Sequence, residues 1–483
     1  MEKIRTRFAP SPTGFMHLGG LRTALYSYLF AKQNGGDFIL RIEDTDQERF
    51  VEGAIDVIYS SLKESGLTYD EGPDIGGPYG PYVQSERKSI YMEYAKKLIE
   101  LGGAYYCFCS KERLETLTDE NGNRKYDKHC LHLSKEEVQA KLDAGEPFVI
   151  RQNIPTEGTS SYDDLVYGTI HVDYSELEDN ILIKSDGMPT YNFANVVDDH
   201  LMRISHVVRG TEYLSSTPKY NLMYDTFGWE RPKYIHLPTI MKDATRKLSK
   251  RYGDANFDDF VNKGYLPEAI INYVALLGWS PKENVEKMTM QQMIDLFSLD
   301  GVSKSPSIFD DAKLRWLNGE YLKELSDEKF EELAEPFFKK SKVYGKYDLK
   351  LLSSLMKTRV EILSEIPEKV DFLEEFGEYD PALFIHKKMK TNEETSLEIL
   401  PAIRNLIANT EPYTHDALHD AFMKLAADSG LKNGQVMWPA RVALTGKDVT
   451  PGGAIEMAEI LGREESLRRI DFSMELLKKA LGK

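Results

Sequence analysis

The stretch Arg7-Phe-Ala-Pro-Ser-Pro-Thr-Gly-Phe-Met-His-Leu-Gly-Gly20 decides how the N-terminal part of this chain folds. It follows a short apolar segment, and its prolines and glycines predict a loop between Phe8 and Gly20. Apolar residues then recur at helical spacing, at Leu21, Leu25, Tyr28 and Leu29. The pattern therefore predicts a strand, a loop and an amphipathic helix in that order, and the N-terminus of a helix attracts anions such as phosphate.

Three residues of the loop fit contact with a phosphate group. Gly19 and Gly20 lack a Cβ atom, which allows a ligand to approach the backbone closely. His17 stands where its ring could donate a hydrogen bond to a phosphate oxygen. The same pattern is equally typical of a turn in which a histidine caps the helix or faces solvent, so a second motif is needed.

The second motif is Lys247-Leu-Ser-Lys-Arg251, which follows the loop Lys242-Asp-Ala-Thr245. It places ammonium groups around a small serine, although taken alone it is more typical of an ordinary basic loop. Together with His17-Leu-Gly-Gly20 it resembles the KMSKS and HIGH signatures of class I aminoacyl-tRNA synthetases.

Flanking motifs narrow this resemblance to the bacterial glutamyl-tRNA synthetases, and the likeness extends along nearly the whole chain. The motifs are Arg7-Phe-Ala-Pro-Ser-Pro-Thr-Gly14, Arg41-Ile-Glu-Asp-Thr-Asp46, Pro189-Thr-Tyr-Asn-Phe-Ala-Asn195 and Val197-Asp-Asp-His200. The resemblance implies ATP-dependent activation of L-glutamate and its transfer to the 3′-terminal adenosine of tRNA(Glu). An enzyme that also glutamylates tRNA(Gln) is the alternative.

The fold class that the resemblance implies is α/β: a Rossmann-type catalytic domain with an inserted acceptor-binding α+β domain, followed by all-α anticodon-binding domains. The expected segments are 1–90 and 191–241 for the two catalytic halves, 91–190 for the insertion, 242–325 for a stem-contact domain with the Lys247–Arg251 loop, and 326–378 and 379–483 for the two helical domains.

Arg7 and Glu43 stand at the ends of predicted strands, and Arg209 closes the apolar run Ile204-Ser-His-Val-Val208. We therefore expect all three in one crevice at the carboxyl ends of the sheet. A structural network of ion pairs is the alternative. By resemblance, Arg7, Arg209 and Tyr191 bind the side-chain carboxylate of glutamate, Glu43 binds its ammonium group, and Ser11 and Asn195 complete the pocket.

The resemblance also implies the ATP site and its chemistry. His17 and Lys250 would donate to phosphate oxygens, with Lys247 secondary, and Mg²⁺ would neutralise the leaving pyrophosphate. Gly19, Gly20, Ser249 and Lys250 would contact ATP.

All three cysteines lie within the expected insertion, at Cys107, Cys109 and Cys130, and His132 follows closely. Two close pairs of such ligands across a loop fit one structural tetrahedral Zn²⁺ site. Tyr126 is a rival to His132 for the fourth position. The alternative is three reduced thiols without a metal.

From about Ser326 the chain is predicted to be helical, with apolar stripes Leu352, Met356, Val360, Leu363 and Leu418, Phe422, Leu425. Within this tail the resemblance places anticodon contacts at Arg359, Arg441, Thr450 and Pro451. Arginine can pair with two groups on a base edge, but surface arginine is also common.

Composition sets further bounds. A chain of 483 residues with 41% hydrophobic content predicts about two to four domains, and the sequence has no apolar run of the roughly 18 to 20 residues that span a membrane. We therefore expect a soluble cytoplasmic protein, and the resemblance implies a monomer. The net charge of −17 opposes binding of nucleic acid, unless basic groups such as Arg468 and Arg469 gather locally.

Two other classes of protein compete with this interpretation. A small-molecule nucleotidyltransferase could share the His17 loop but would not need the helical tail. A catalytically silent tRNA-binding paralogue would not need His17, Gly19 and Lys250 together.

Overall fold

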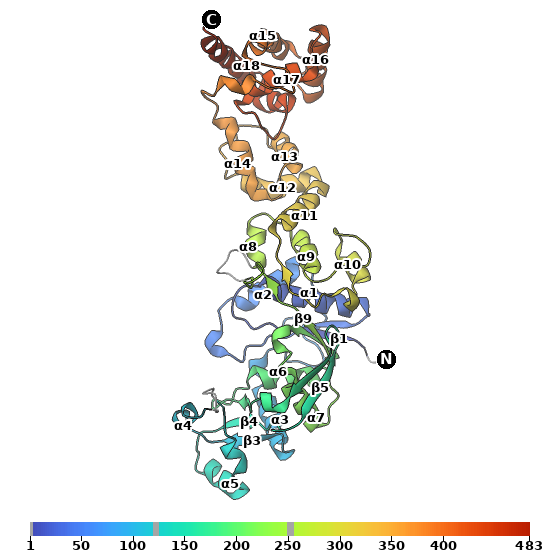
Figure 1. Cartoon of the computed structure of the whole chain (residues 1–483), viewed down its shortest axis with the longest axis vertical. Coiled ribbons are helices and arrows are strands. Elements are labelled where there is room, and N and C mark those ends of the chain that lie inside the picture. The colour runs from blue at the N-terminus through green and yellow to red at the C-terminus, as the bar shows by residue number, and fades with distance from the viewer. Residues whose placement is uncertain (1–2, 119–124, 249–255) are drawn as a thin grey trace. The chain divides into compact units, whose positions relative to one another are not determined.

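The computed structural model of the chain describes residues 3–118, 125–248 and 256–483 (Figure 1). The chain divides into two compact units. The first contains Met1–Val261 with Pro267–Asp311, and the second contains Asn262–Leu266 with Ala312–Lys483. The first unit is mixed α/β and the second is helical, in agreement with the predicted fold class.

The strand–loop–helix unit predicted around the N-terminal motif is present. Strand β1 (Arg5–Phe8) pairs in parallel with β2 (Asp37–Leu40), and helix α1 (Leu18–Gln33) connects them. Both strands are almost completely buried. Strand β2 carries the apolar residues Phe38, Ile39 and Leu40, whereas β1 buries two arginines, Arg5 and Arg7, in ion pairs. The helix ends at Gln33 and is capped by Asn34, and the left-handed conformation of Gly35 stops it there.

A four-stranded sheet lies beside this pair, in the order β6-β5-β9-β8. Its strands are β5 (Thr159–Asp164), β6 (Gly168–Asp173), β8 (His206–Gly210) and β9 (Lys233–Leu237). Strands β8 and β9 are parallel. The amide of Ser205, just before β8, donates to the carbonyl of Arg5 over 3.0 Å, so β1 and β8 begin side by side. Nη1 of Arg7 donates to the carbonyl of Val208 over 3.2 Å, which brings the carboxyl ends of the two strands together.

The segment 91–190, predicted as an insertion, contributes to two sheets. Strands β3 (Ala104–Cys107), β4 (Val149–Gln152) and β7 (Ile181–Ile183) form an antiparallel sheet, and helices α4 (Lys111–Glu115) and α5 (Lys135–Asp143) belong to the same region. The β5–β6 hairpin instead extends the sheet that contains β8 and β9.

Further helices surround these sheets, and some of them pack against α1. They are α2 (Ala54–Glu64), α3 (Lys88–Glu100), α6 (Tyr191–Leu201), α7 (Thr217–Phe227), α8 (Phe257–Asn262), α9 (Pro267–Leu276) and α10 (Met290–Leu296), with the short strands β10 (Ile240–Met241) and β11 (Ser307–Ile308). The hydroxyl of Tyr26 on α1 donates to the carbonyl of Ala275 on α9 over 2.8 Å. This bond and the buried packing around it fix the direction in which the N-terminus of α1 points.

The second unit contains helices and no strand among its described residues (Figure 1). Its helices are α11 (Asp311–Glu324, which begins in the first unit), α12 (Asp327–Phe338), α13 (Leu349–Lys357), α14 (Ile366–Val370), α15 (Glu393–Asn409), α16 (His415–Asp428), α17 (Asn433–Thr445) and α18 (Ala454–Ala480).

The two apolar stripes predicted for this unit have different outcomes. The stripe of Leu418, Phe422 and Leu425 lies on one helix, α16, as predicted. The stripe from Leu352 to Leu363 is divided, because α13 ends at Lys357. Val360 and Leu363 are nevertheless buried, so burial was predicted correctly and the continuous helix was not.

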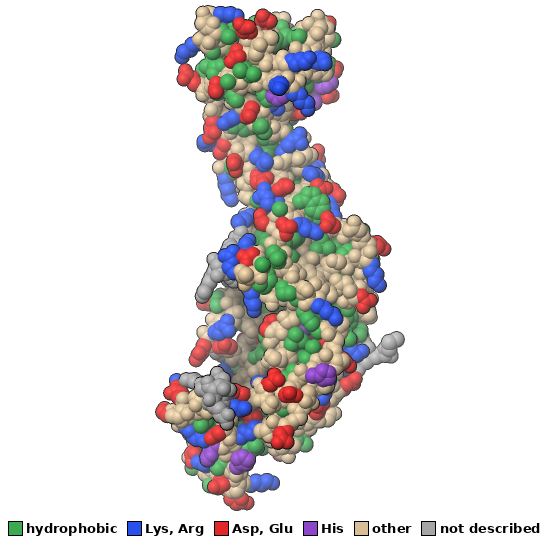
Figure 2. Space-filling view, in the orientation of Figure 1, with side chains coloured by type: hydrophobic (Ala, Val, Ile, Leu, Met, Phe, Trp, Pro, Cys, Tyr) green, Lys and Arg blue, Asp and Glu red, His purple; other side chains and the backbone are tan. Residues whose placement is uncertain are grey.

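Charge is mixed on the surface. On the face drawn in Figure 2, lysine and arginine side chains are interspersed with aspartate and glutamate and do not form one large patch. Among the described residues, no helix is both long and apolar enough to cross a membrane.

Candidate active site

A cavity of about 630 Å³ opens at the carboxyl ends of β1 and β8 and at the N-terminus of α1. It brings together residues that the sequence predicted to converge from distant segments. Seven of those predicted residues line it: Arg7, Ser11, His17, Gly20, Glu43, Tyr191 and Arg209. Open α/β sheets bind ligands at the carboxyl ends of their strands, and the cavity lies there, as the sequence predicted.

His17 caps helix α1. Its Nδ1 atom accepts a hydrogen bond from the amide of Gly19 over 3.1 Å. In a neutral ring this bond leaves the proton on Nε2, which makes that nitrogen a donor. The capping and phosphate-binding interpretations of His17 are therefore compatible, since they use different ring nitrogens.

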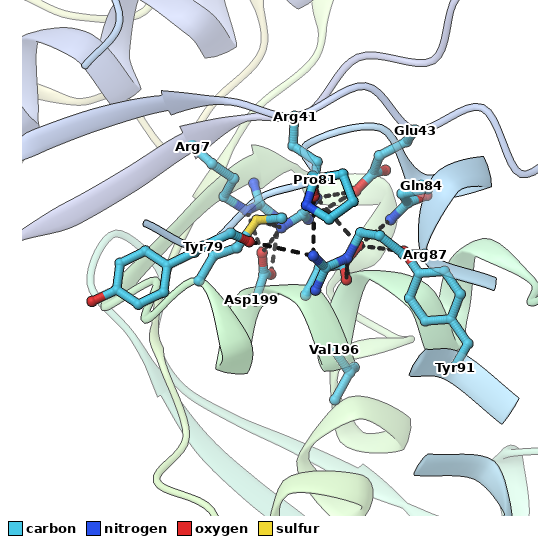
Figure 3. Close-up of polar contacts among 12 residues, drawn as sticks. Arg7, Arg41, Glu43, Tyr79, Pro81, Gln84, Arg87, Tyr91, Val196 and Asp199 are labelled. Atoms are coloured by element: carbon cyan, nitrogen blue, oxygen red, sulfur yellow. Dashed lines mark hydrogen bonds and ion pairs between the residues drawn. The ribbon is translucent and has the colours of Figure 1, made fainter. Parts of the chain in front are cut away.

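Arg7 belongs to a buried network of ion pairs behind the cavity (Figure 3). Its Nε and Nη2 atoms donate to the two carboxylate oxygens of Asp199 on α6 over 3.0 and 3.2 Å. Asp199 also accepts from Nη1 of Arg41 over 2.8 Å, and Nη2 of Arg41 donates to Glu43 over 2.8 Å. These two guanidinium and two carboxylate groups are formally neutral together.

Arg209 has a different environment. It is only 5% exposed. Its Nε donates to His236 Nε2 over 3.1 Å, and its Nη2 donates to the hydroxyl of Thr217 over 2.6 Å. Among the described residues, no carboxylate forms an ion pair with it. A buried guanidinium without a direct carboxylate partner is suited to bind an anion, because leaving such a charge uncompensated is costly.

A second hydrogen bond fixes the ring that holds Arg209. Nδ1 of His236 lies 2.7 Å from a carboxylate oxygen of Asp164 on β5. Burial lowers the pKa of His236, despite this carboxylate, so the ring is neutral and can accept from Arg209 at Nε2. The tautomer with its proton on Nδ1 satisfies both neighbours.

Two more groups in the cavity have pKa values set by burial. Burial raises the pKa of Tyr191 well above its ordinary value, so its hydroxyl stays a neutral donor. Burial also raises the pKa of Glu43, and the guanidinium groups of Arg41 and Arg7 oppose that shift. The cavity thus offers a cation, a neutral hydroxyl and a carboxyl group at different points of its wall.

Some predicted residues do not line this cavity. Asn195 is buried one turn along α6 from Tyr191, and its Nδ2 atom has no hydrogen-bond partner among the described residues. Gly19 and the exposed Lys247 are also outside the lining. Ser249, Lys250 and Arg251 lie outside the described residues.

Residues 3–316 match the family model described as tRNA synthetases class I (E and Q), catalytic domain. The chain belongs to this family of class I tRNA synthetases. A second family model, an anticodon binding domain, matches residues 329–474 of this synthetase. The family predicted from the sequence motifs is confirmed.

Relatives of this synthetase match along its whole length. A glutamate–tRNA ligase from Clostridium botulinum (strain Eklund 17B / Type B) is 58% identical over 484 residues, covering 99% of both chains. One from Clostridium tetani (strain Massachusetts / E88) is 58% identical over 481 residues, covering 99% of this chain and 98% of the relative.

Solved structures agree. A crystal structure of a glutamate tRNA ligase from Elizabethkingia meningosepticum CCUG26117, in complex with its amino acid, superposes on this chain with a TM-score of 0.88 at 37% identity. The match covers 99% of this chain and 100% of that chain. A glutamate-tRNA synthetase from Elizabethkingia anophelis gives a TM-score of 0.87 at 36% identity, covering 98% and 100%.

The three cysteines of this synthetase form one cluster. The sulfur atoms of Cys107, Cys109 and Cys130 lie within 4.8 Å of one another. The hydroxyl of Tyr126 is 3.4 Å from Cys107 Sγ and 3.6 Å from Cys109 Sγ. His132, predicted as the fourth ligand, is exposed and lies outside this group.

The geometry of one short helix explains why His132 lies outside the cysteine cluster. Cys130 and His132 both lie in the 3₁₀ turn His129–His132, where three residues complete a turn. Residues two apart therefore point in different directions, and Cys130 is buried while His132 faces solvent. The structure places Tyr126, the rival in the sequence interpretation, beside the thiols.

The four predicted anticodon contacts lie in the second unit. Nε of Arg359 donates to the carbonyl of Pro451 over 2.7 Å, and the hydroxyl of Thr450 donates to the carbonyl of Gly452 over 2.6 Å. Arg441 donates to the carbonyl of Asp448, and its guanidinium carbon lies 4.4 Å from the centre of the Trp438 ring. All four thus lie at or beside the loop that precedes α18.

Sequence reasoning gave no role to several residues that shape the site: Arg41, Asp164, Asp199, Thr217 and His236. A signal did exist for two of them. Arg41 and Asp199 lie in motifs that carried the family resemblance, and two consecutive aspartates within an apolar helix predict buried partners. No local pattern indicated that His236 would meet Arg209.

Proposed function

We propose that this chain is a glutamate–tRNA ligase, which activates L-glutamate with ATP and transfers the glutamyl group to the terminal adenosine of tRNA(Glu). One observation carries the proposal: Arg209 is buried in the cavity wall without a direct carboxylate partner among the described residues. The names of the relatives at 58% identity support the same assignment.

In this proposal the cavity binds glutamate at both ends. Glu43 receives the ammonium group, and Arg209 with Tyr191 receives the side-chain carboxylate. Arg7 adds positive potential, but its Nε and Nη2 are already bonded to Asp199. Ser11 lies on the cavity wall, and Asn195, whose Nδ2 lacks a partner, supports the wall from α6.

The charge of Arg209 accounts for selection of glutamate over glutamine. A glutamate side chain offers a carboxylate that pairs with the guanidinium through charge-assisted hydrogen bonds. Glutamine offers a neutral amide, which would leave the buried cation uncompensated and would set amide hydrogens against guanidinium hydrogens.

ATP is proposed to bind at the N-terminus of α1. His17, through Nε2, and the backbone at Gly19 and Gly20 would contact phosphate oxygens, together with Lys247, Ser249 and Lys250 from the second motif. Attack of a carboxylate on the α-phosphorus requires no proton transfer, so positioning and charge stabilisation account for catalysis. Mg²⁺ bound to ATP would neutralise part of the triphosphate charge.

The second unit is proposed to bind the anticodon through Arg359, Arg441, Thr450 and Pro451. The anticodon-domain match to residues 329–474 supports this role. Arg441 lies over Trp438, an arrangement that could hold a guanidinium flat against a base edge.

The cysteine cluster is proposed to hold one structural Zn²⁺. Three sulfur donors and a phenol oxygen at close distances fit a closed tetrahedral site, and thiolates are ligands that zinc favours. Zinc would tie β3 to the turn that contains Cys130. Metal analysis with a chelator challenge tests this: Tyr126→Phe should lose zinc faster than the parent protein, whereas His132→Ala should not. The reverse order would restore His132 as the ligand.

Charging assays test the proposed function. Purified tRNA(Glu) and tRNA(Gln) transcripts are each incubated with ATP and labelled glutamate or glutamine. We expect glutamate to be attached to tRNA(Glu). Charging of tRNA(Gln) with glutamate as well would favour the alternative of a non-discriminating enzyme. Failure to charge either transcript with an enzyme that is fully folded would reject the proposal.

A further inference from the structure

We propose that Arg41 and Asp199 are positioning residues that form a rigid bridge between the two ends of the amino-acid site. The inference rests on the proposed function and deepens it. In this view the bridge fixes the position of Glu43, which receives the ammonium group, relative to Arg7 beside the carboxylate end. It therefore sets the side-chain length that the pocket accepts.

The bridge is an unbroken line of direct contacts (Figure 3). Nη2 of Arg41 donates to Oε1 of Glu43 over 2.8 Å, and Nη1 of Arg41 donates to Oδ1 of Asp199 over 2.8 Å. Oδ1 of Asp199 also accepts from Nε of Arg7 over 3.0 Å. Figure 3 shows Asp199 reaching from helix α6 toward Arg7 and Arg41, with Glu43 on the other side of Arg41.

Each member of the bridge is held from more than one side. Arg41 is fully buried, with an exposed fraction of 0%, and its Nε also lies 3.3 Å from Glu43 Oε1. Both carboxylate oxygens of Asp199 accept hydrogen bonds from Arg7, and Nη1 of Arg7 donates to the carbonyl of Val208 on β8 over 3.2 Å. A side chain with this many fixed contacts has little freedom to adjust to a shorter or longer ligand.

The neighbouring residue supplies a matched control. Asp198 lies on the same helix, is equally buried, and forms its own set of bonds with Arg87, Gln84 and Tyr91. None of these three partners lines the candidate active-site cavity. The ion-pair distance from Asp198 to Arg41 is 3.9 Å, which is too long for a hydrogen bond.

The experiment compares Asp199→Asn with Asp198→Asn. Both replace a buried carboxylate by an amide of the same shape, so both should lower the melting temperature. Only Asp199→Asn removes the anion between Arg7 and Arg41, which lets the two cations separate. We expect it to raise KM for glutamate by about tenfold or more, because a buried ion pair has lost one member. KM for ATP should stay within about twofold, since neither Arg41 nor Asp199 lines the cavity that His17 lines.

Length selection is the decisive readout. With Asp199→Asn, aspartate should compete with glutamate more strongly, relative to the parent enzyme, in the tRNA-dependent pyrophosphate exchange assay. Asp198→Asn should keep the parent's ratio. Arg41→Lys serves as a second variant, because lysine keeps the charge but cannot reach both carboxylates with a planar fork, and it should reproduce the loss of selection.

The outcomes separate the inference from the proposed function. If the parent enzyme does not charge tRNA(Glu), the proposed function fails first. If it does, and the two asparagine variants lose activity equally with unchanged aspartate competition, the bridge has only a structural role and the inference is overturned. The same conclusion follows if Asp199→Asn and Arg41→Lys both fail to fold while Asp198→Asn folds.

Discussion

Replacing Arg209 by glutamine tests the centre of the proposed site. Glutamine keeps a polar side chain, although a shorter one, and removes the positive charge. Two nitrogens of Arg209 are engaged by His236 and Thr217, through Nε and Nη2. Nη1 and the second hydrogen of Nη2 remain to face a substrate carboxylate, so a two-pronged interaction is possible.

The expected loss follows from this count. A hydrogen bond to a charged group contributes about 1.5–3 kcal/mol, so losing two of them would cost about 3–6 kcal/mol. Since each 1.4 kcal/mol is about tenfold, kcat/KM for glutamate should fall by at least about one hundredfold. Selection against glutamine should fall with it, because the charge that distinguishes the two substrates is gone.

The assay is ATP–pyrophosphate exchange in the presence of tRNA(Glu), with glutamate and glutamine as competing substrates. Arg231→Gln is the control, because Arg231 is an exposed arginine that pairs with Asp225 and does not line the cavity. Circular dichroism melts verify that both variants fold. A folded Arg209→Gln enzyme with a kcat/KM for glutamate within about threefold of the parent would refute the reasoning.

Three further predictions concern stability and tRNA binding. Burial lowers the pKa of His206 to about 4, below the value of about 6.5 in an unfolded chain. The unfolded state therefore binds a proton first as the pH falls, and the stability present above about pH 6.5 is lost toward pH 4. His206→Gln should flatten the fall in melting temperature between about pH 7 and pH 5, and an unchanged slope would contradict this assignment. In Gly36→Ala, the new Cβ would lie 2.2 Å from the carbonyl oxygen of Ile4, so the free energy of unfolding in guanidinium chloride should drop by about 1–3 kcal/mol. Arg441→Gln should weaken binding of tRNA(Glu) by about tenfold or more in a filter assay without changing KM for glutamate, and equal binding would remove Arg441 from the anticodon site.

The sequence predicted the elements around the active site well, because their signals are local. Proline, glycine and the helical spacing after Gly20 predicted α1, and the structure places it at Leu18–Gln33. Apolar runs predicted β2 and β8 near Asp37–Leu40 and His206–Gly210. The division of the stripe after Lys357 was missed, since spacing alone does not indicate where a helix ends.

The sequence predicted residues that line the cavity, but it did not predict the buried residues that hold them in position. Arg7, Glu43 and Arg209 could be placed together because each was expected at the carboxyl end of a strand. Their buried partners come from segments whose proximity depends on the whole fold: Asp199 lies 192 residues from Arg7 in the chain, and His236 lies 27 residues from Arg209. Such pairs leave no periodic pattern, so only the structure identifies them.

In the proposed function the guanidinium groups of Arg7 and Arg209 have separate tasks, which the sequence could not distinguish. Arg7 is bonded to Asp199 before any ligand arrives, so its charge is already compensated within the protein. Arg209 is held by a neutral ring and a hydroxyl, which orient it without cancelling its charge. A carboxylate that enters the cavity consequently gains more from Arg209 than from Arg7, because only Arg209 lacks a direct anionic partner among the described residues. In the proposed function, recognition of an acidic substrate therefore depends mainly on Arg209 in β8, whereas the geometry of the pocket depends on the ion pairs between β1 and α6.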